Sequence, residues 1–522
     1  MPKMFQSMSP LDDTIVFAGP ESTPANIKQA ITTARQSEIL WHSTPLSQRI
    51  QIARNYAKHL SDHREEICGL ISREVGKLPW DADAEVNAAI GKIDLTVNAL
   101  AERRSKTVNE SGSLARVVRY HPLGVALVLG PFNFPLHLPG GQIVPALLAG
   151  NTIVFKPSDQ ATAVGKWMID AWREAGLPDG VMQMIQGGVE VAVAAIDSPE
   201  INAVFLTGSR AAGRAIHRQL AGRPNVLLAL ELGGNNPVVV SDSIPSETVA
   251  ELVTFSAFIS SGQRCSCARR SVFIESSQSE AHIEAVVQRT QSLVVGLPGD
   301  ETSPDVGPLI SALAARQLRK TYDALLAHGC TAVVPWKVNS RRENLVHPMI
   351  VDATHCSETQ LTAIGELEWF GPLLVIQRVA DFNAAVTTAA NTPYGLAATL
   401  LGGTSSMFEN FVDGVGAGVV NWNRPTTGAA GSLPFGGLGD SGNHRAAGYH
   451  AIDSAATPSH RYNPRPIPNP LQRSIPGTSP SSVKKFGTRL PACQQCPFQP
   501  AHTLSSFYFT IVNLTFSIVP SP

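Results

Sequence analysis

Cysteine is scarce in this sequence, with seven residues in a chain of 522. So few cysteines exclude a disulfide framework and favour a reducing compartment, so we expect a cytoplasmic protein. Segment 1–17 lacks the basic-then-apolar pattern of a secretory leader, and no apolar run reaches the roughly 20 residues of a membrane-spanning helix. Neither charge dominates, since 41 basic residues face 42 acidic ones, so neither nucleic acid nor a membrane is an expected partner.

Apolar residues recur at two different periods along the chain. Residues 23–100 carry them at helical spacing, and Thr23-Pro24 is typical of a helix start. From residue 115 onward, an exposed strand is followed by short apolar runs that alternate with helical patterns. This alternation predicts an α/β protein with parallel sheets covered on both faces. The expected buried strands are 124–130, 152–155, 181–185, 203–206, 238–240, 272–274 and 373–376, with helices such as 161–175 and 189–196 between them.

One cysteine stands in a stretch suited to nucleophilic chemistry, Gly262-Gln263-Arg264-Cys265-Ser266-Cys267-Ala268-Arg269-Arg270. It follows an apolar helical run and precedes a strand, so the Cys265 thiol is expected on a connection, fixed but reachable. The neighbouring arginines, Arg264, Arg269 and Arg270, are expected to favour the reactive thiolate. The alternative is a buried inert thiol, the common fate of free cysteine, and Cys267 is interpreted in that way.

Two stretches at predicted strand ends are suited to a nucleotide, because open α/β sheets bind ligands there. Gly208–Gly213 joins a strand to a helix, and the backbone N–H groups of a helix start attract phosphate. Lys156 and Asp159 follow another strand, where they would hold ribose hydroxyls. An ordinary turn explains each of these patterns equally well.

Two more strand ends carry polar side chains suited to catalysis. Glu231 interrupts an apolar run just before Gly233-Gly234, and a carboxylate there is either paired structurally or tuned as a base. Asn133 lies in Pro131-Phe132-Asn133-Phe134-Pro135, where prolines on both sides stiffen an amide donor.

In this order and spacing, the five stretches resemble the aldehyde dehydrogenase superfamily. Later segments extend the resemblance: Glu368-Trp369-Phe370-Gly371-Pro372, Asn391–Ala397 and Pro434-Phe435-Gly436-Gly437 look like that superfamily's further signatures. Together they cover roughly residues 12–458. The resemblance implies that Cys265 is the nucleophile, that Asn133 and the Cys265 N–H hold the oxyanion, and that Glu231 activates water.

The resemblance also implies NAD as cofactor and no metal. The acidic Asp159 would repel the 2′-phosphate of NADP. Arg424 is expected either to bind a substrate carboxylate or to be a surface or interface residue, and Phe435 is expected to line the substrate tunnel. The residues expected to bind NAD are Gly208, Ser209, Arg210, Ala211, Ala212, Gly213, Lys156, Asp159, Glu368 and Phe370.

The resemblance further implies a Rossmann-type NAD-binding domain (1–103 and 123–233) and an α/β catalytic domain (234–445). An oligomerisation hairpin (104–122, joined by about 446–460) would make the protein a homo-oligomer, either dimer or tetramer. Two departures stand out: Pro139-Gly140-Gly141-Gln142 replaces the usual Pro-Asn-Gly-His, and the usual opening hairpin is expected to be missing. The proline- and serine-rich segment 461–522 is expected to be disordered.

Within the superfamily, the chain most resembles the branch that oxidises N-succinylglutamate 5-semialdehyde in arginine catabolism. Residues 143–151, 421–425 and 442–445 carry that resemblance. Another semialdehyde is the alternative substrate. Two other classes of function are an NAD-independent thiol hydrolase, which leaves Gly208–Gly213 and Glu368 unexplained, and a catalytically silent use of the fold, against which the intact Cys265, Glu231 and Asn133 argue.

Overall fold

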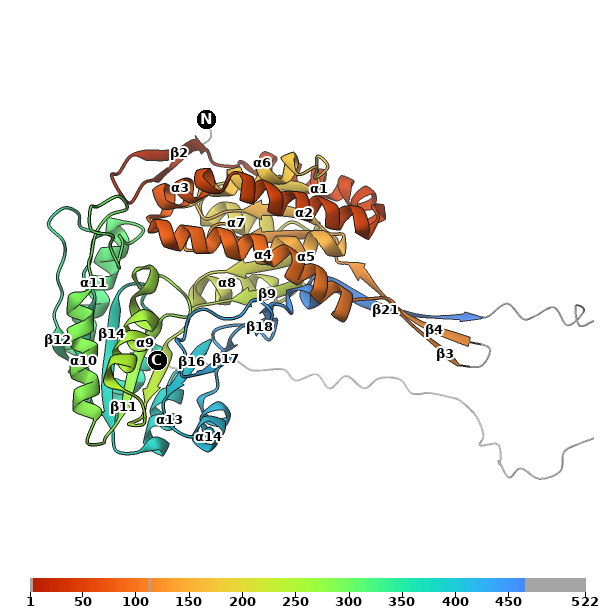
Figure 1. Ribbon diagram of the computed structural model, residues 1–522. Helices are drawn as coiled ribbons and strands as arrows, with labels where there is room; N and C mark the ends of the chain where they lie inside the picture. The colour runs from red at the N-terminus through yellow and green to blue at the C-terminus, as the bar shows by residue number, and fades with distance from the viewer. Residues whose placement is uncertain (1–2, 112–113, 465–522) are drawn as a thin grey trace, which may run out of the picture. The chain divides into compact units, whose positions relative to one another are not determined.

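A five-stranded parallel sheet organises the first half of the chain in the computed structural model, which describes residues 3–111 and 114–464 (Figure 1). Its strand order is β7-β6-β5-β8-β9. β5 and β6 are buried along their whole length, which agrees with their continuous apolar sequences. The strands are β5 (Val125–Leu129), β6 (Thr152–Lys156), β7 (Met182–Met184), β8 (Ile201–Thr207) and β9 (Leu227–Glu231).

Helices pack on both faces of this sheet and bury two separate cores. α2 to α6 contribute to one core, whereas α7, α8 and the first half of α1 contribute to the other. α1 begins at the predicted position, because Thr23 and Asn26 cap it with reciprocal hydrogen bonds. Within 3–111 and 114–464, no helix has the length and apolarity to cross a membrane. The helices are α1 (Pro24–Ser43), α2 (Leu46–Asp62), α3 (Arg64–Val75), α4 (Pro79–Arg103), α5 (His137–Ala149), α6 (Thr162–Glu174), α7 (Val189–Ile196) and α8 (Arg210–Leu220).

A seven-stranded sheet of order β12-β13-β14-β11-β10-β16-β17 organises the second half. All neighbours are parallel except β12 and β13, as the predicted alternation of strands and helices requires. The strands are β10 (Asn236–Val240), β11 (Ala268–Ile274), β12 (Thr331–Val334), β13 (Met349–Asp352), β14 (Leu373–Val379), β16 (Ala397–Leu401) and β17 (Val419–Trp422). The helices are α9 (Ser246–Phe258), η1 (Ile259–Gly262), α10 (Ser279–Ser292), α11 (Ala312–Ala327), α12 (Glu358–Glu366), α13 (Phe382–Ala390), α14 (Ser405–Val415) and η2 (Ala451–Ser454).

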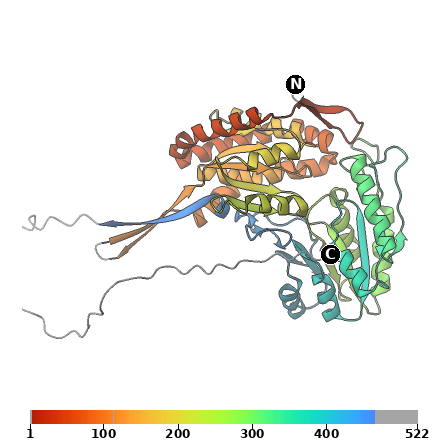
Figure 2. The same ribbon diagram turned by 180° about the vertical axis from the view of Figure 1, so that it is seen from behind.

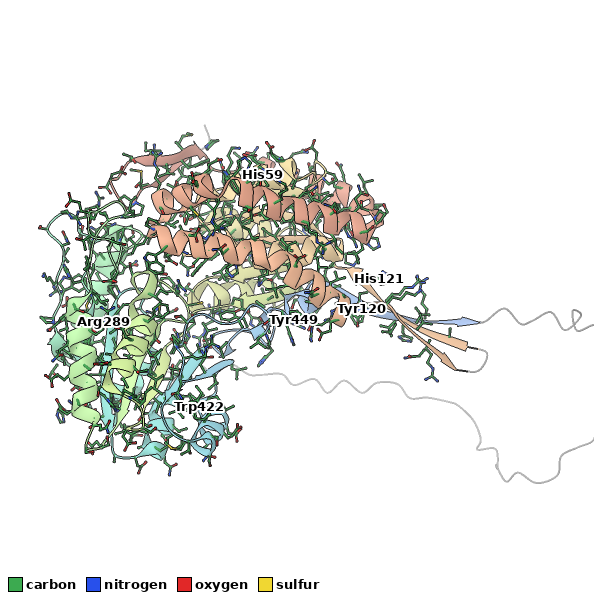
Figure 3. The ribbon with its side chains drawn as sticks, viewed as in Figure 1. His59, Tyr120, His121, Arg289, Trp422 and Tyr449 are labelled. Atoms are coloured by element: carbon green, nitrogen blue, oxygen red, sulfur yellow. The ribbon has the colours of Figure 1, made fainter. Side chains whose placement is uncertain are left out.

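Three antiparallel strands form a narrow sheet that extends away from the rest of the described fold (Figures 1 and 2). They are β3 (Thr107–Ser111), β4 (Leu114–Pro122) and β21 (Ala456–Pro464). Figure 3 places Tyr120 and His121 where β4 leaves the body, and the His121 Nε2 lies 2.8 Å from the Ser459 Oγ on β21. β21 pairs with β4 as far as Pro464, beyond the expected end of the joining segment near 460. The rest of the tail, for which disorder is predicted, lies outside the described residues.

The opening of the chain corrects one expectation. β1 (Met4–Met8) and β2 (Ile15–Pro20) form an antiparallel hairpin, so the prediction that this hairpin is missing was wrong. The two strands are short and mostly half-buried or exposed, so they show no strong alternation. Their turn is made by side chains: the Asp12 carboxylate accepts the Thr14 N–H at 3.1 Å, and Asp13 takes a left-handed φ of 59°.

Two very short strand pairs complete the fold near the C-terminal end of the described residues. β15 (Tyr394–Gly395) pairs with β19 (Leu438–Gly439), and β18 (Pro434–Phe435) pairs with β20 (Ala447–Gly448). The segment also contacts the five-stranded sheet, since Glu231 forms an isolated bridge with Gly442. These contacts place the segment 434–448 over β9, the last strand of the five-stranded sheet.

Candidate active site

One large cavity, of about 1210 Å³, is lined by loops that follow the strands of the five-stranded sheet. Its wall includes Asn133 after β5, Lys156 at the end of β6, Gly208 after β8 and Glu231 at the end of β9. Cys265, which precedes β11 of the other sheet, lines the same cavity. Side chains that are far apart in the sequence therefore meet at the carboxyl ends of the strands.

The loop before Cys265 is held in an unusual conformation. Ser260, Ser261 and Gly262 have φ values of 51°, 58° and 71°, which are left-handed. At Gly262 only glycine fits, because a Cβ atom would lie 2.2 Å from the carbonyl oxygen of Gly371. Ser261 donates a hydrogen bond of 2.9 Å to the Gly307 carbonyl, which offsets part of its backbone strain.

The electrostatic surroundings of Cys265 differ from the expectation. The thiol is half-buried, and burial together with the Glu231 carboxyl raises its pKa to about 12. The negative charge of Glu368 acts in the same direction, while the Ser266 N–H opposes it. In this state of the protein the thiol therefore keeps its proton.

Of the three nearby arginines, Arg269 attracts a thiolate at Cys265 electrostatically, but burial outweighs this attraction and keeps the thiol pKa high. Arg264 forms an ion pair of 2.8 Å with Asp81. Arg269 donates to the backbone carbonyls of Gly262 and Arg264, and Arg270 to the side chain of Asn235 and to the carbonyls of Thr388 and Ala389. These hydrogen bonds and the ion pair direct the guanidinium groups to other acceptors and fix the loop, while burial is the largest cause of the raised thiol pKa.

Asn133 is attached to the loop that carries Cys265. Its buried side-chain amide donates a hydrogen bond of 2.9 Å to the carbonyl of Gln263. On the other side of the loop, Asn236 donates to the carbonyls of Cys265 and Cys267, each at 2.8 Å. The two asparagines fix the backbone on either side of the thiol.

Glu231 ends β9 inside the cavity with its carboxyl group buried. Burial raises its pKa well above the ordinary value, and the Ala447 N–H opposes this only in part. No side chain among residues 3–111 and 114–464 donates a hydrogen bond to it. A Cβ atom at Gly436 would lie 3.2 Å from its Oε1, so the segment from the end of the chain packs closely over the carboxyl. Such an environment makes the carboxylate a stronger base than an exposed glutamate.

The expected pyrophosphate turn is a helix start facing the cavity. Ser209 caps α8 by accepting the Ala212 N–H at 3.2 Å, and Gly208, Ser209 and Ala212 line the cavity. Arg210, Ala211 and Gly213 do not line it. Arg210 pairs with Asp440, while Gly213 permits close packing, since a Cβ atom there would lie 2.6 Å from the Leu232 side chain.

The two residues expected at a ribose also line the cavity. Lys156 is buried, and burial lowers its pKa; its ammonium donates to the Pro157 carbonyl at 3.2 Å. Asp159 is exposed. The pair therefore presents one cation and one carboxylate at the end of β6.

Glu368, Phe370 and Phe435 line the cavity as well. Burial raises the pKa of Glu368, and its carboxyl lies against Gly233, where a Cβ atom would come within 1.4 Å of Oε1. Arg424 differs from these residues, because it is exposed and does not line the cavity. Its contact with a substrate stays a prediction.

Several polar and charged side chains on or next to α4 and α5 were missed by the sequence interpretation. Lys77, just before α4, and Asp81 are buried beside the cavity, and Glu85, Lys92 and His137 line it. The signal was present, because charged residues interrupt the apolar face predicted for 86–100. Within the described ranges, no group of three or more His, Cys, Asp or Glu residues is arranged to hold a metal ion.

The cavity at the strand ends combines a cysteine, a buried glutamate and a helix N-terminus suited to phosphate. Comparison with known proteins agrees with this site: the chain belongs to the aldehyde dehydrogenase family, whose sequence profile matches residues 2–459. It is 44% identical over 454 residues to N-succinylglutamate 5-semialdehyde dehydrogenase 2 of Caulobacter vibrioides, covering 87% of this chain and 92% of that one.

Two solved structures are similar along most of their length. One is 1-pyrroline-5-carboxylate dehydrogenase from Thermus with bound NAD, with 26% identity and a TM-score of 0.83 over 89% of this chain and 90% of that one. The other is the NADP-dependent glyceraldehyde-3-phosphate dehydrogenase of Bacillus halodurans complexed with NADP, with 27% identity and a TM-score of 0.82 over 89% and 96%. The predicted family and α/β fold class are confirmed.

Proposed function

We propose that the protein oxidises an aldehyde to a carboxylic acid with NAD, through a thioester on Cys265. The observation that carries this proposal is the single cavity in which Cys265, Asn133 and Glu231 meet the start of α8. A thiol hydrolase would not require a helix N-terminus suited to phosphate in the same cavity. A catalytically inactive protein with this fold would not require the buried carboxyl group of Glu231.

In this mechanism the sulfur of Cys265 attacks the aldehyde carbon, and the carbonyl oxygen becomes an oxyanion. Asn133 is held against the loop of Cys265 by one amide hydrogen, so its other amide hydrogen and the Cys265 N–H serve as donors to that oxyanion. Each such donor contributes about 3 kcal/mol to the stabilisation of the transition state. The high pKa of the thiol means that the sulfur loses its proton as it attacks; the neighbouring Glu231 carboxylate accepts that proton and passes it to solvent.

After the aldehyde hydrogen has left the oxyanion as hydride, a thioester remains on Cys265, and Glu231 serves as general base. Its raised pKa makes the carboxylate a stronger base than an exposed one, so it takes a proton from water, and the resulting hydroxide attacks the thioester. The carbon–sulfur bond breaks, the acid leaves, and the thiol of Cys265 is restored. Because Glu231 is buried beside the thiol, its charge and that of a thiolate disfavour each other, so ionisation of one group raises the pKa of the other.

The cavity fits NAD at the end that faces α8. The start of α8, where Gly208 and Ser209 line the cavity, would receive the pyrophosphate; Lys156 and Asp159 would hold a ribose, and Val189 and Ile216 would form an apolar wall for the adenine. Bound NAD would supply the hydride acceptor. Asp159 favours NAD over NADP, because a carboxylate repels a 2′-phosphate.

The proposed substrate is N-succinyl-L-glutamate 5-semialdehyde, and the product is N-succinyl-L-glutamate, as in arginine catabolism. The relative from Caulobacter vibrioides that carries this substrate in its name supports the assignment. Another carboxylated semialdehyde is the second candidate. We also propose a cytoplasmic homo-oligomer, a dimer or tetramer, supported by the projecting sheet of β3, β4 and β21 and by the scarcity of cysteine.

Rapid-mixing kinetics with NAD and a panel of aldehydes test this proposal. Cys265→Ala should form no NADH, whereas Glu231→Gln should form up to one NADH per site quickly and then turn over slowly. Cys68→Ala, a half-buried thiol on α3 outside the cavity wall, is the matched control and should behave as wild type. Normal turnover of Cys265→Ala would refute the mechanism, and an unchanged steady state in Glu231→Gln would remove the base.

A further inference from the structure

Lys92 is a buried lysine without a counter-charge. It lies on α4, its residue is only 6% exposed, and it lines the cavity. Among residues 3–111 and 114–464, no carboxylate pairs with its ammonium and no hydrogen bond satisfies it. Burial alone lowers its pKa, with no neighbouring negative charge opposing that change. A buried cation of this kind is costly unless something binds to it.

The other charges around this part of the wall cancel each other. Lys77 pairs with Glu85 at 2.7 Å, and Arg264 pairs with Asp81 at 2.8 Å. These two pairs leave Lys92 as the uncompensated charge of the group. Its field reaches along the wall, since Lys92 is one of the cations that, after burial, lower the pKa of His137 to about 3.

The facing helix offers space and a second polar group. A Cβ atom at Gly141 of α5 would lie 4.0 Å from the Cε of Lys92, so the lysine reaches across to α5 where no side chain blocks the cavity. Gln142, the next residue, is buried, lines the cavity, and has no side-chain hydrogen bond to any described residue. An ammonium and an amide that both lack partners can together hold a carboxylate.

We propose that Lys92 is a specificity-determining residue that binds a carboxylate of the aldehyde substrate, with Gln142 as a second donor. This inference rests on the proposed function, and it gives the anionic substrate a partner inside the cavity. Arg424, the partner expected from the sequence, is exposed and outside the cavity wall.

The test compares a carboxylated and a neutral aldehyde at saturating NAD. Lys92→Met should raise the KM for N-succinylglutamate semialdehyde roughly ten- to a hundredfold, the loss typical of one charged hydrogen bond, while kcat/KM for hexanal should not fall. Lys92→Arg keeps the charge and should retain part of the preference. Lys28→Met, an exposed lysine of α1, is the matched control and should change neither substrate.

Equal losses on both aldehydes, or no loss on either, would overturn the role of Lys92. A selective loss in Arg424→Met without one in Lys92→Met would also overturn it. If wild type oxidises hexanal but not N-succinylglutamate semialdehyde, the proposed substrate is wrong. The same comparison is then made with succinate semialdehyde. A loss of activity in Lys92→Met on succinate semialdehyde but not on hexanal supports the carboxylate role of Lys92, and no such selective loss refutes it. Lys92→Gln replaces Lys92→Met if the latter does not fold.

Discussion

Asp81 is the side chain through which α4 holds the nucleophile loop. Its carboxylate, in a side chain 2% exposed, accepts a hydrogen bond from Arg264 at 2.8 Å and another from the hydroxyl of Ser260. It also lies 3.9 Å from the ammonium of Lys77. We predict that Asp81→Asn, which keeps the shape and removes the charge, disturbs both stability and catalysis.

The magnitude follows from burial. Removing one partner of a buried ion pair costs about 3–5 kcal/mol, because the remaining charge stays buried and uncompensated. Ser260 and Ser261 adopt left-handed conformations that cost about 1–3 kcal/mol each, so the loop is expected to relax once this contact weakens. A shift of about 1 Å in the position of Cys265 is enough to lower kcat by roughly a hundredfold.

Asp83→Asn is the matched control, since Asp83 lies on the same helix and forms an ion pair with Arg64 at the surface. Thermal unfolding and kcat are measured for both variants, together with the rate at which iodoacetamide alkylates Cys265. Asp81→Asn should lower the melting temperature and kcat, whereas Asp83→Asn should change both little, because an exposed ion pair contributes little. Equal effects in the two variants would refute the reasoning, as would wild-type kcat in Asp81→Asn.

Two further predictions concern the base and the cofactor. Burial raises the pKa of Glu231, so the carboxylate becomes protonated, and loses its function as a base, at a pH above the usual carboxyl range. Steady-state NADH formation should therefore fall as the pH drops through the raised pKa of Glu231. The Glu231→Gln variant should lack this fall in rate. Asp159→Ser should raise kcat/KM with NADP relative to NAD, and an unchanged ratio between the two cofactors would contradict the ribose assignment.

The sequence determined those features that depend on local pattern. Continuous apolar runs identified β5 and β6, whose residues are all buried, and alternation with helices identified parallel sheets. The motifs for Glu231 and Asn133 were also readable, because each ends or follows a strand, and the ends of parallel strands meet at one edge of a sheet. The motif for Cys265 was readable because it lies on the connection between a helical run and the strand β11. The hairpin formed by β1 and β2 was missed, since its short strands carry little pattern.

The electrostatic interactions between charged groups depend on the tertiary structure. Arg264, Arg269 and Arg270 adjoin Cys265 in sequence, yet Asp81 and backbone carbonyls bind them, so burial dominates the thiol pKa. Lys92, in contrast, is remote from Cys265 in sequence and lines the same cavity. The electrostatic effect of a charge depends on its distance, its burial and its partners, and these quantities exist only once the helices and sheets have packed.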